Sequence, residues 1–591
     1  MNYSCDCIIC QKKHNPGCTD REFRDNSDIL RCQLGKIEEQ SNVCVCPTRI
    51  NMAEKKYKNY NYNGSFHKSL KHNLRDGRLV SDNDYVKMKN SIIDNDQKLL
   101  DSVLLDPKSS LKLVNPLASW ATVLVGIPQC ELDVEPPAIL SSNAAAADMM
   151  EIYGQAIARD VPFIKYDTDN TISKLLSVGR MNDPVLLANL KFSPSHGLPF
   201  TSKTIFRGNL AGELVGPRIS QLFLLDVPIG SLIIKQLYYV QPSRKYAQQN
   251  NFRVEWGVSL NETISIQNGN IDILPPDTPK NELLKRYIYS GRSLANSVEN
   301  KNAPYQLFYQ AALILLQLGA QANPGFPKYQ NQIGQATNFG AAFILTSIAD
   351  ISLYAQKNAF YWKWQHFRNL YPEVFALWIN DVKNNLVPNK NNFDLTDLAL
   401  NNKMLQDIYH INNATLPGAN SYTLPLMLRA GSPVHPPYPS IRGEIAGACC
   451  TILKIFFKTD QPWLSLPGVI NGELSGIPNA IVEANKDGTK LKKYSGNGAN
   501  QYEITITDEI NKLCSNAITG RDWTGLGYRS DCFAGALIGE QLAIHYMEDL
   551  LSSTVENNIQ PEMSVPEIKF RRFDGTIAII RPTICKKKLC N

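Results

Sequence analysis

The second half of the chain is dominated by long segments in which apolar residues recur at three- and four-residue steps. That spacing places the apolar side chains on one face of an α-helix, so it predicts helices that pack side by side. Small residues, among them Ala446, Gly447 and Ala448, would let two such helices approach closely. We therefore predict a mainly α fold built on a helical bundle. The expected helices span residues 305–321, 336–356, 359–384, 443–458, 505–519 and 531–552.

The first half adds one clear helix and a small amount of β structure. Residues 137–160 contain a Ser/Asn cap followed by Met149, Ile152, Tyr153 and Ile157 at helical spacing. The β-branched or alternating runs at 231–240 and 252–266 predict a small sheet or an excursion between helices. Near the end of the chain, residues 567–580 alternate around an Asp-Gly pair, which predicts a β-hairpin.

Half of the fourteen cysteines lie in the first 46 residues, which marks a separate N-terminal segment. Its thiolate and imidazole groups have a spacing that a zinc ion can use, since zinc prefers four such ligands. Disulfides, or free thiols in a disordered arm, explain the same composition. The segment is also a candidate attachment site for a protein partner. The candidate zinc ligands are Cys5, Cys7, Cys10, His14 and Cys18.

The distribution of residue types divides the chain into three parts. The Cys-rich segment covers residues 1–50, and a polar extension covers residues 51–110. This extension is rich in Asn, Lys, Asp and Tyr with few periodic apolar positions, so we expect a tether or a partly ordered arm. The helical domain covers residues 111–591.

The composition also excludes several classes of protein. A net charge of +6 spread over 591 residues makes neither nucleic acid nor an acidic membrane an expected partner. The longest apolar stretches are about half the ~20 residues of a membrane-spanning helix, and the start MNYSCDCIIC lacks the apolar core of a signal peptide. We expect a soluble protein without a membrane span. The many Asn, Lys and Ile residues suit an AT-rich genome, so we consider a virus particle beside the cytoplasm as its location.

Three segments far apart in the sequence combine cationic and small polar residues at or near helix starts, namely residues 361–373, 431–457 and 516–531. A helix that follows Ser440 would aim its N-terminal amides at an anion. The segments together predict an oxyanion pocket, with solvated helix faces as the alternative for their charged side chains. The candidate residues are Lys363, Arg368, Ser440, Arg442, Arg521 and Arg529.

The same three segments, in this order, resemble the signature segments of the vanadium haloperoxidase and type 2 phosphatidic-acid phosphatase superfamily, and those of algal vanadium bromoperoxidases in particular. The resemblance includes stretches such as PPAILSSNAAAADMMEIYGQAIARD, IAGACCTILKIFF and RFDGTIAII, and covers about residues 114–580. It implies helical bundles of the vanadium haloperoxidase type, with small β excursions and the C-terminal hairpin. It also implies a homo-oligomer.

Four positions keep the residue that the resemblance requires. Lys363, Ser440 and Arg521 match vanadate-binding residues, and His435 matches the histidine that tunes halide chemistry. The remaining histidines of the helical domain lie outside the motifs, so we expect them to be packing or surface groups. They include His196, His366 and His545.

Four other positions depart from the family pattern. Tyr371 replaces an arginine of the oxyanion site, Ile441 replaces a glycine whose amide approaches vanadate, and Arg442 replaces the acid/base histidine. Gly527 replaces the histidine that bonds to vanadium and that is the nucleophile in the related phosphatases. Because glycine carries no imidazole, this change removes both chemistries.

We therefore expect a catalytically inactive relative with a structural or binding role, without bound vanadate or another cofactor apart from N-terminal zinc. An active bromoperoxidase or an acid phosphatase with altered ligands is the alternative. The pocket is expected to keep a weak affinity for a small anion unless Glu444 pairs with the added arginine. The residues of this predicted anion site are Lys363, Ser440, Arg442, Arg521 and His435.

Overall fold

The structure, a computed structural model, describes residues 63–121, 125–127, 129, 132–299, 303–326, 339–387, 393–496, 503–553 and 567–581. The candidate zinc ligands Cys5, Cys7, Cys10, His14 and Cys18 lie outside the described residues. None of the helices in the described ranges has the length and apolar character that a membrane crossing requires.

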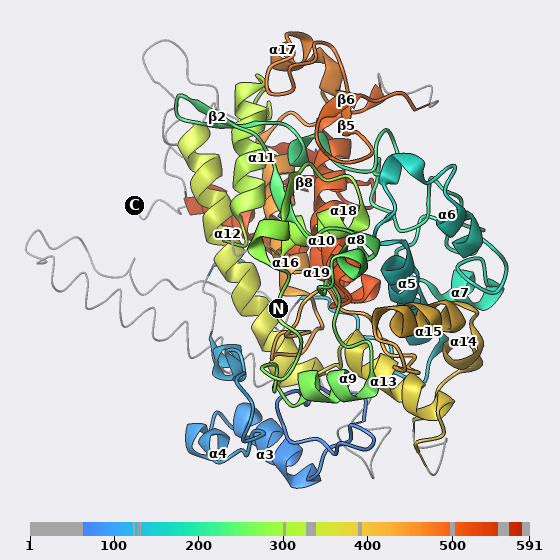
Figure 1. The fold of residues 1–591 in the computed structure, drawn as a ribbon. Helices are drawn as coiled ribbons and strands as arrows, with labels where there is room; N and C mark the ends of the chain where they lie inside the picture. The colour runs from blue at the N-terminus through green and yellow to red at the C-terminus, as the bar shows by residue number, and fades with distance from the viewer. Residues whose placement is uncertain are drawn as a thin grey trace, which may run out of the picture.

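The fold is mainly α, as predicted, and its centre is a bundle of long helices that run side by side (Figure 1). Helices α16 and α19 approach so closely that a Cβ on Gly447 would lie 2.0 Å from the carbonyl oxygen of Ala536. A Cβ on Gly539 would lie 2.1 Å from the carbonyl oxygen of Glu444. The predicted role of small residues in helix packing is therefore confirmed at this pair. The bundle consists of α10 (Gly291–Val298), α11 (Gln306–Gln317), α12 (Ala341–Tyr361), α16 (Ile441–Phe456), α18 (Ile506–Thr524) and α19 (Arg529–Ser553).

The helix predicted over residues 359–384 is broken into two. Helix α12 ends at Tyr361 and continues into a π-helical segment, Trp362–Phe367, which carries Lys363. Arg368 then adopts a left-handed conformation with φ of 36°, and Pro372 begins α13 (Pro372–Lys383). Proline cannot continue a helix because it lacks the N–H and clashes with the preceding turn, but it suits the first helical position.

Further helices flank the bundle, and α5 is the longest of them. The Ser142 hydroxyl caps α5 by accepting a hydrogen bond from the backbone N–H of Ala145 at 3.1 Å, as the sequence predicted. The flanking helices are α5 (Asn143–Ala158), α6 (Asn170–Leu175), α7 (Pro184–Asn189), α8 (Arg244–Gln249), α9 (Leu260–Gln267), α13, α14 (Asp397–Asn401), α15 (Met404–Thr415) and α17 (Pro467–Ile470).

The assignment of residues 252–266 to a small sheet was wrong, because α9 occupies the second half of this range. Gly257, at φ of +70°, ends the extended run, and Ser259 accepts a hydrogen bond from the backbone N–H of Glu262 at 3.3 Å. Ile264 and Ile266 are both buried, so two faces of this helix contact the core. Burial on two faces produces the alternating pattern that suggested a strand.

The β structure in the described residues consists of two-stranded antiparallel hairpins and pairs. The predicted C-terminal hairpin is confirmed, with Ile568 opposite Ile580 and Gly575 in the left-handed conformation at its turn. The pairs are β1 (Val227–Ile229) with β2 (Leu232–Ile234), β3 (Tyr238–Val240) with β4 (Leu284–Arg286), β5 (Val482–Ala484) with β6 (Leu491–Lys493), and β7 (Ile568–Arg571) with β8 (Ile577–Ile580).

The polar extension is not a tether over its described part, residues 63–110. It contains α3 (Asp82–Ile93) and α4 (Gln97–Asp101), which lie at the lower end of the molecule in Figure 1. Scattered apolar side chains of this extension form a second buried cluster against residues of the π-helical segment and its surroundings. The few apolar positions of the extension are thus sufficient to form a buried cluster, because another element covers them. The cluster contains Phe66, Leu70, Tyr85, Met88, Ile92, Phe360, Trp364, Tyr371 and Val434.

Candidate functional site

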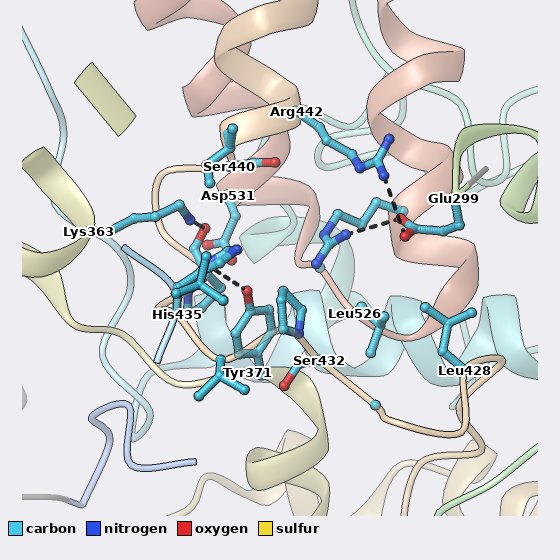
Figure 2. A pocket seen from close by; sticks show the side chains of 18 of the residues that line it. Glu299, Lys363, Tyr371, Leu428, Ser432, His435, Ser440, Arg442, Leu526 and Asp531 are labelled. Carbon is cyan, nitrogen blue, oxygen red and sulfur yellow. Dashed lines mark hydrogen bonds and ion pairs between the residues drawn. The ribbon is translucent and has the colours of Figure 1, made fainter. Parts of the chain in front are cut away.

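The three predicted segments meet at a cavity of about 460 Å³. Lys363 reaches it from the π-helical segment, and Ser440, Ile441 and Arg442 reach it from the start of α16. Arg521 comes from the last turn of α18, and the loop before α19 contributes Gly527. The side chains in Figure 2 thus come from elements that are far apart in sequence. Residues of all three segments thus lie around one cavity.

Two arginines of the cavity share one carboxylate, that of Glu299 (Figure 2). Nη1 of Arg521 lies 3.0 Å from Oε1 of Glu299, and Nη2 of Arg442 lies 3.5 Å from Oε2. Burial alone would raise the pKa of Glu299, but Arg442 and Arg521 reverse this effect and lower it. Glu299 is therefore charged and neutralises one of the two guanidinium groups.

Glu444 does not pair with Arg442, so its expected role as the competing carboxylate was wrong. Its side chain is buried in α16 and accepts a hydrogen bond from Nδ2 of Asn358 at 2.7 Å. Burial raises the pKa of Glu444 to about 8, so it is largely neutral at pH 7. The carboxylate that meets Arg442 instead follows α10 and was not singled out in the sequence, because its own segment carries no motif.

Lys363 is buried on the other side of the cavity from the arginine pair (Figure 2). Its Nζ donates hydrogen bonds to the carbonyl oxygens of Pro436, at 2.7 Å, and of Pro437. Burial lowers the pKa of Lys363 to about 7. Asp531 lines the same cavity, and neither of its side-chain oxygens has a hydrogen-bond partner. Burial raises the pKa of Asp531 well above its usual range, so its carboxyl is neutral.

Tyr371 occupies the space between His435 and Arg521. Its Oη lies 3.3 Å from Nδ1 of His435, and that Nδ1 lies 2.8 Å from the carbonyl oxygen of Pro436. Because a carbonyl only accepts, Nδ1 carries the proton. Burial lowers the pKa of His435 well below its usual value. The histidine is therefore neutral.

Ser440 and Gly527 are both constrained by their immediate neighbours. The Ser440 hydroxyl caps α16, where it accepts a hydrogen bond from the backbone N–H of Gly443 at 3.2 Å. A Cβ on Gly527 would lie 3.0 Å from Oδ1 of Asp522 and 3.5 Å from Sγ of Cys532. Position 527 therefore leaves little room for a side chain before neighbouring groups move.

Two of the candidate cations do not belong to the site. Arg529 is buried away from the cavity, where its Nε donates to Oε2 of Glu151 at 2.6 Å. Nη1 of Arg368 donates to the carbonyl oxygens of Trp364 and Gln365, each at 2.9 Å. Arg529 pairs with a buried carboxylate and Arg368 donates to backbone carbonyls. The positive charge of the pocket is therefore smaller than we predicted from the sequence.

Among the described histidines, His435 alone lines the cavity. His366 is buried against the rings of Tyr361 and Trp362. His545 lies on α19, where its Nδ1 is 3.0 Å from Oε2 of Glu548 and its side chain is half-exposed. His366 is thus a packing group and His545 a surface group, as expected.

Known proteins resemble this chain over nearly its whole length. It is 30% identical over 575 residues to a vanadium-dependent bromoperoxidase of Ascophyllum nodosum, a match that covers 94% of each chain. The chain belongs to the vanadium-dependent bromoperoxidase family. A second vanadium-dependent bromoperoxidase, from Corallina pilulifera, is 28% identical over 612 residues, covering 92% of this chain and 96% of the relative. No family model matches the chain.

A solved structure has the same fold. It is the homohexameric second vanadate-dependent bromoperoxidase of Ascophyllum nodosum, with a TM-score of 0.78 at 24% identity. The match covers 98% of this chain and 94% of the other. The helical architecture of the bromoperoxidase family is therefore retained here.

The residues of the cavity do not fit the vanadate that the family name implies. An oxyanion needs cations that are free to face it, and the metal needs a donor atom on the protein. Here Arg442 and Arg521 face Glu299, and the Lys363 amine faces two carbonyls. Gly527 has no donor, and the Glu299 carboxylate would repel an oxyanion.

Proposed function

We propose that this member of the bromoperoxidase family does not brominate and that it uses the helical scaffold in a structural or binding role. The observation that carries the proposal is the position of Glu299, whose carboxylate lies between Arg442 and Arg521 inside the cavity. An internal anion takes up the charge that an oxyanion would need. The missing imidazole at Gly527 and the altered residues Tyr371 and Ile441 support the same conclusion.

The size of the expected loss follows from the chemistry. Removal of a nucleophile typically lowers the rate by about 10⁴- to 10⁶-fold, and removal of an acid/base group alone by about 10²- to 10⁴-fold. The two losses do not multiply, because residues that act as a unit are not additive. His435 is the one described histidine in the cavity, and it is neutral and bonded to the backbone. A single imidazole cannot act as metal donor and as acid/base group together.

The test is a bromination assay on the purified full chain, with orthovanadate, hydrogen peroxide, bromide and a phenol dye. We expect no dye bromination above the buffer rate, and no hydrolysis of a phosphate monoester in the parallel phosphatase assay. A vanadate-dependent bromination rate would favour the alternative, an active bromoperoxidase with altered ligands. Phosphate release would favour the acid phosphatase.

We also propose that the chain forms a homo-oligomer, because the structural relative is a homohexamer and the match covers nearly both chains. Light scattering on the purified protein at several concentrations measures the assembled mass. A monomer at all concentrations would contradict this proposal. A virus particle remains a candidate location for such an assembly.

A further inference from the structure

Four lysine side chains are fully buried in the part of the chain that the structure describes, and one of them lacks the ion pair that the other three form. Nζ of Lys68 lies 3.2 Å from Glu373, that of Lys454 lies 3.2 Å from Glu540, and that of Lys512 lies 2.8 Å from Glu509. Lys363 has no carboxylate within 4.0 Å among the described residues. Burial of an amine without a counter-charge favours its neutral form.

The hydrogen bonds of Lys363 suit a neutral amine. Nζ has two acceptors among the described residues, the carbonyl oxygens of Pro436 and Pro437. A neutral amine has two N–H groups and one lone pair, so it satisfies both carbonyls and keeps the lone pair free. An ammonium group would bury a third N–H without an acceptor. The pKa of Lys363, lowered by burial to about 7, agrees with this geometry.

The cavity gives a small molecule access to this amine. Its volume of about 460 Å³ lies in the range of sites for small ligands. Lys112, Val114 and Pro304 are exposed and mark the open end, whereas Lys363 and Asp531 are buried. Apolar side chains form much of the wall between these ends, which suits an uncharged apolar ligand. They include Leu111, Val434, Ile441, Ile445 and Leu526.

A proton donor lies on the same side of the cavity as the amine. In Figure 2 the Asp531 carboxyl lies on the Lys363 side of the cavity, apart from the group formed by Glu299 and the two arginines. Both oxygens of Asp531 are buried without a hydrogen-bond partner. A buried neutral carboxyl can donate a proton to a leaving hydroxyl group.

We propose that Lys363 captures small apolar aldehydes as an imine in this cavity. The Nζ lone pair forms a bond to the carbonyl carbon, and the carbonyl π electrons move to the oxygen. Transfer of one amine proton to that oxygen gives a carbinolamine. Asp531 then protonates the hydroxyl group, the C–O bond breaks and water leaves. The product is a protonated imine at Lys363 beside the carboxylate of Asp531, so atoms and charge balance.

This inference goes beyond the proposed function and does not depend on it. Imine formation uses an amine and a carboxyl group, without vanadate, peroxide or halide. The bromination assay and the labelling of Lys363 measure different products. Failure of the proposed function can therefore be told apart from failure of this inference.

The test is reductive trapping on the full chain at pH 7, with benzaldehyde as the probe and cyanoborohydride to reduce the imine. Peptide mass spectrometry then measures the rate at which each lysine gains a benzyl group. We expect Lys363 to be labelled at least about tenfold faster than Lys112, which lies at the cavity mouth, because the neutral amine is the nucleophile. Lys68, which is equally buried but paired with Glu373, is the control for burial and should stay unlabelled.

Two variants refine the result. Asp531→Asn keeps the size of the side chain but removes the proton donor, so labelling of Lys363 should slow by about 10²-fold. Lys363→Arg should remove the fast-labelled site while Lys112 is labelled as before. The proposal is overturned if, in the folded unmodified protein, Lys363 is unlabelled or is labelled no faster than Lys112. The lysine-by-lysine comparison needs no variant, so it stands even where a substitution prevents folding.

Discussion

Glu299 and Arg521 lie 222 residues apart in the sequence, yet Oε1 of the glutamate is 3.0 Å from Nη1 of the arginine inside the cavity. Arg442 approaches the second oxygen of the same carboxylate. By the resemblance of the motifs, Arg521 is expected at a vanadate-binding position and Arg442 at the position of the acid/base histidine. The Glu299 carboxylate thus lies where a bound anion would be expected. It should therefore compete with anions for the two arginines.

Glu299→Gln should create an anion site that the unmodified protein largely lacks. The neutral amide leaves two guanidinium groups without a counter-charge, and phosphate can supply one. We expect phosphate to raise the melting temperature of the variant, with a stabilisation of about 2.7 kcal/mol at a hundredfold excess over the dissociation constant. The unmodified protein should shift little. A thermal-shift titration with phosphate measures both.

The control for this prediction is the double variant Glu299→Gln with Arg521→Ala, which should lose the phosphate shift because one cation is gone. Glu282→Gln, at a partly exposed glutamate outside the cavity, should behave like the unmodified protein. An equal shift in the unmodified protein and in Glu299→Gln would contradict the account, because Glu299 would then not compete with anions.

Lys68 connects the N-terminal extension to the cavity wall. Its Nζ donates to the carbonyl oxygens of Ala430, at 2.8 Å, and Ser432, at 2.6 Å, and forms the buried ion pair with Glu373. Lys68→Met leaves a buried carboxylate without its cation, so we expect a loss of about 3 to 5 kcal/mol in the free energy of unfolding. Urea denaturation monitored by circular dichroism measures this loss.

The matched control is Lys191→Met, which breaks the ion pair between Lys191 and Glu135 on the surface. Both side chains are at least half exposed, so the loss should stay below about 1 kcal/mol. If both variants lose the same free energy of unfolding, the extension is not held by the buried pair, and its role in shaping the cavity wall has to be revised.

The stability of the protein should fall as the pH falls below about 6.5. His67 and His72 are buried with Nδ1 of His67 2.9 Å from Nε2 of His72. Burial lowers the pKa of both, and that of His72 to about 4. A lowered folded-state pKa gives stability that is present above the unfolded pKa of 6.5 and is lost as the pH falls towards 4. His72 alone accounts for a loss on the order of 3 kcal/mol.

Urea denaturation at a series of pH values from 7.5 to 4 measures this slope. His67→Gln should reduce the slope because it removes one buried imidazole, whereas His410→Gln, at an exposed position of α15, should leave it unchanged. Stability that is constant between pH 7 and pH 5 would contradict the assignment of two neutral buried histidines.

Periodic apolar residues were the most informative feature of the sequence. They predicted the bundle helices, since α16, α18 and α19 begin and end within a few residues of the expected positions, apart from an extra turn at the end of α18. The break after Tyr361 was missed, because the π-helical turn around Lys363 depends on tertiary packing. The β structure expected at residues 252–266 is a helix in its second half, because burial on two faces removes the helical period.

The candidate site was predictable only where motifs marked it. Lys363, Ser440 and Arg521 meet in one cavity as expected. Glu299 was missed, since a carboxylate that pairs across hundreds of residues leaves no local spacing in the sequence. Asp531 ends one of the three segments but was missed, because its burial without a partner cannot be read from the sequence. Arg529 was wrongly included because its exposure cannot be read from its neighbours, and it is in fact buried against Glu151.

Retention of vanadium tests the central claim most directly. The purified full chain is dialysed to equilibrium against orthovanadate, and the protein-bound vanadium per chain is measured by element analysis. Because Gly527 offers no donor and Glu299 opposes an oxyanion, we predict far less than one vanadium per chain. About one vanadium per chain, lost in Lys363→Ala and Arg521→Ala variants that still fold, would contradict the account.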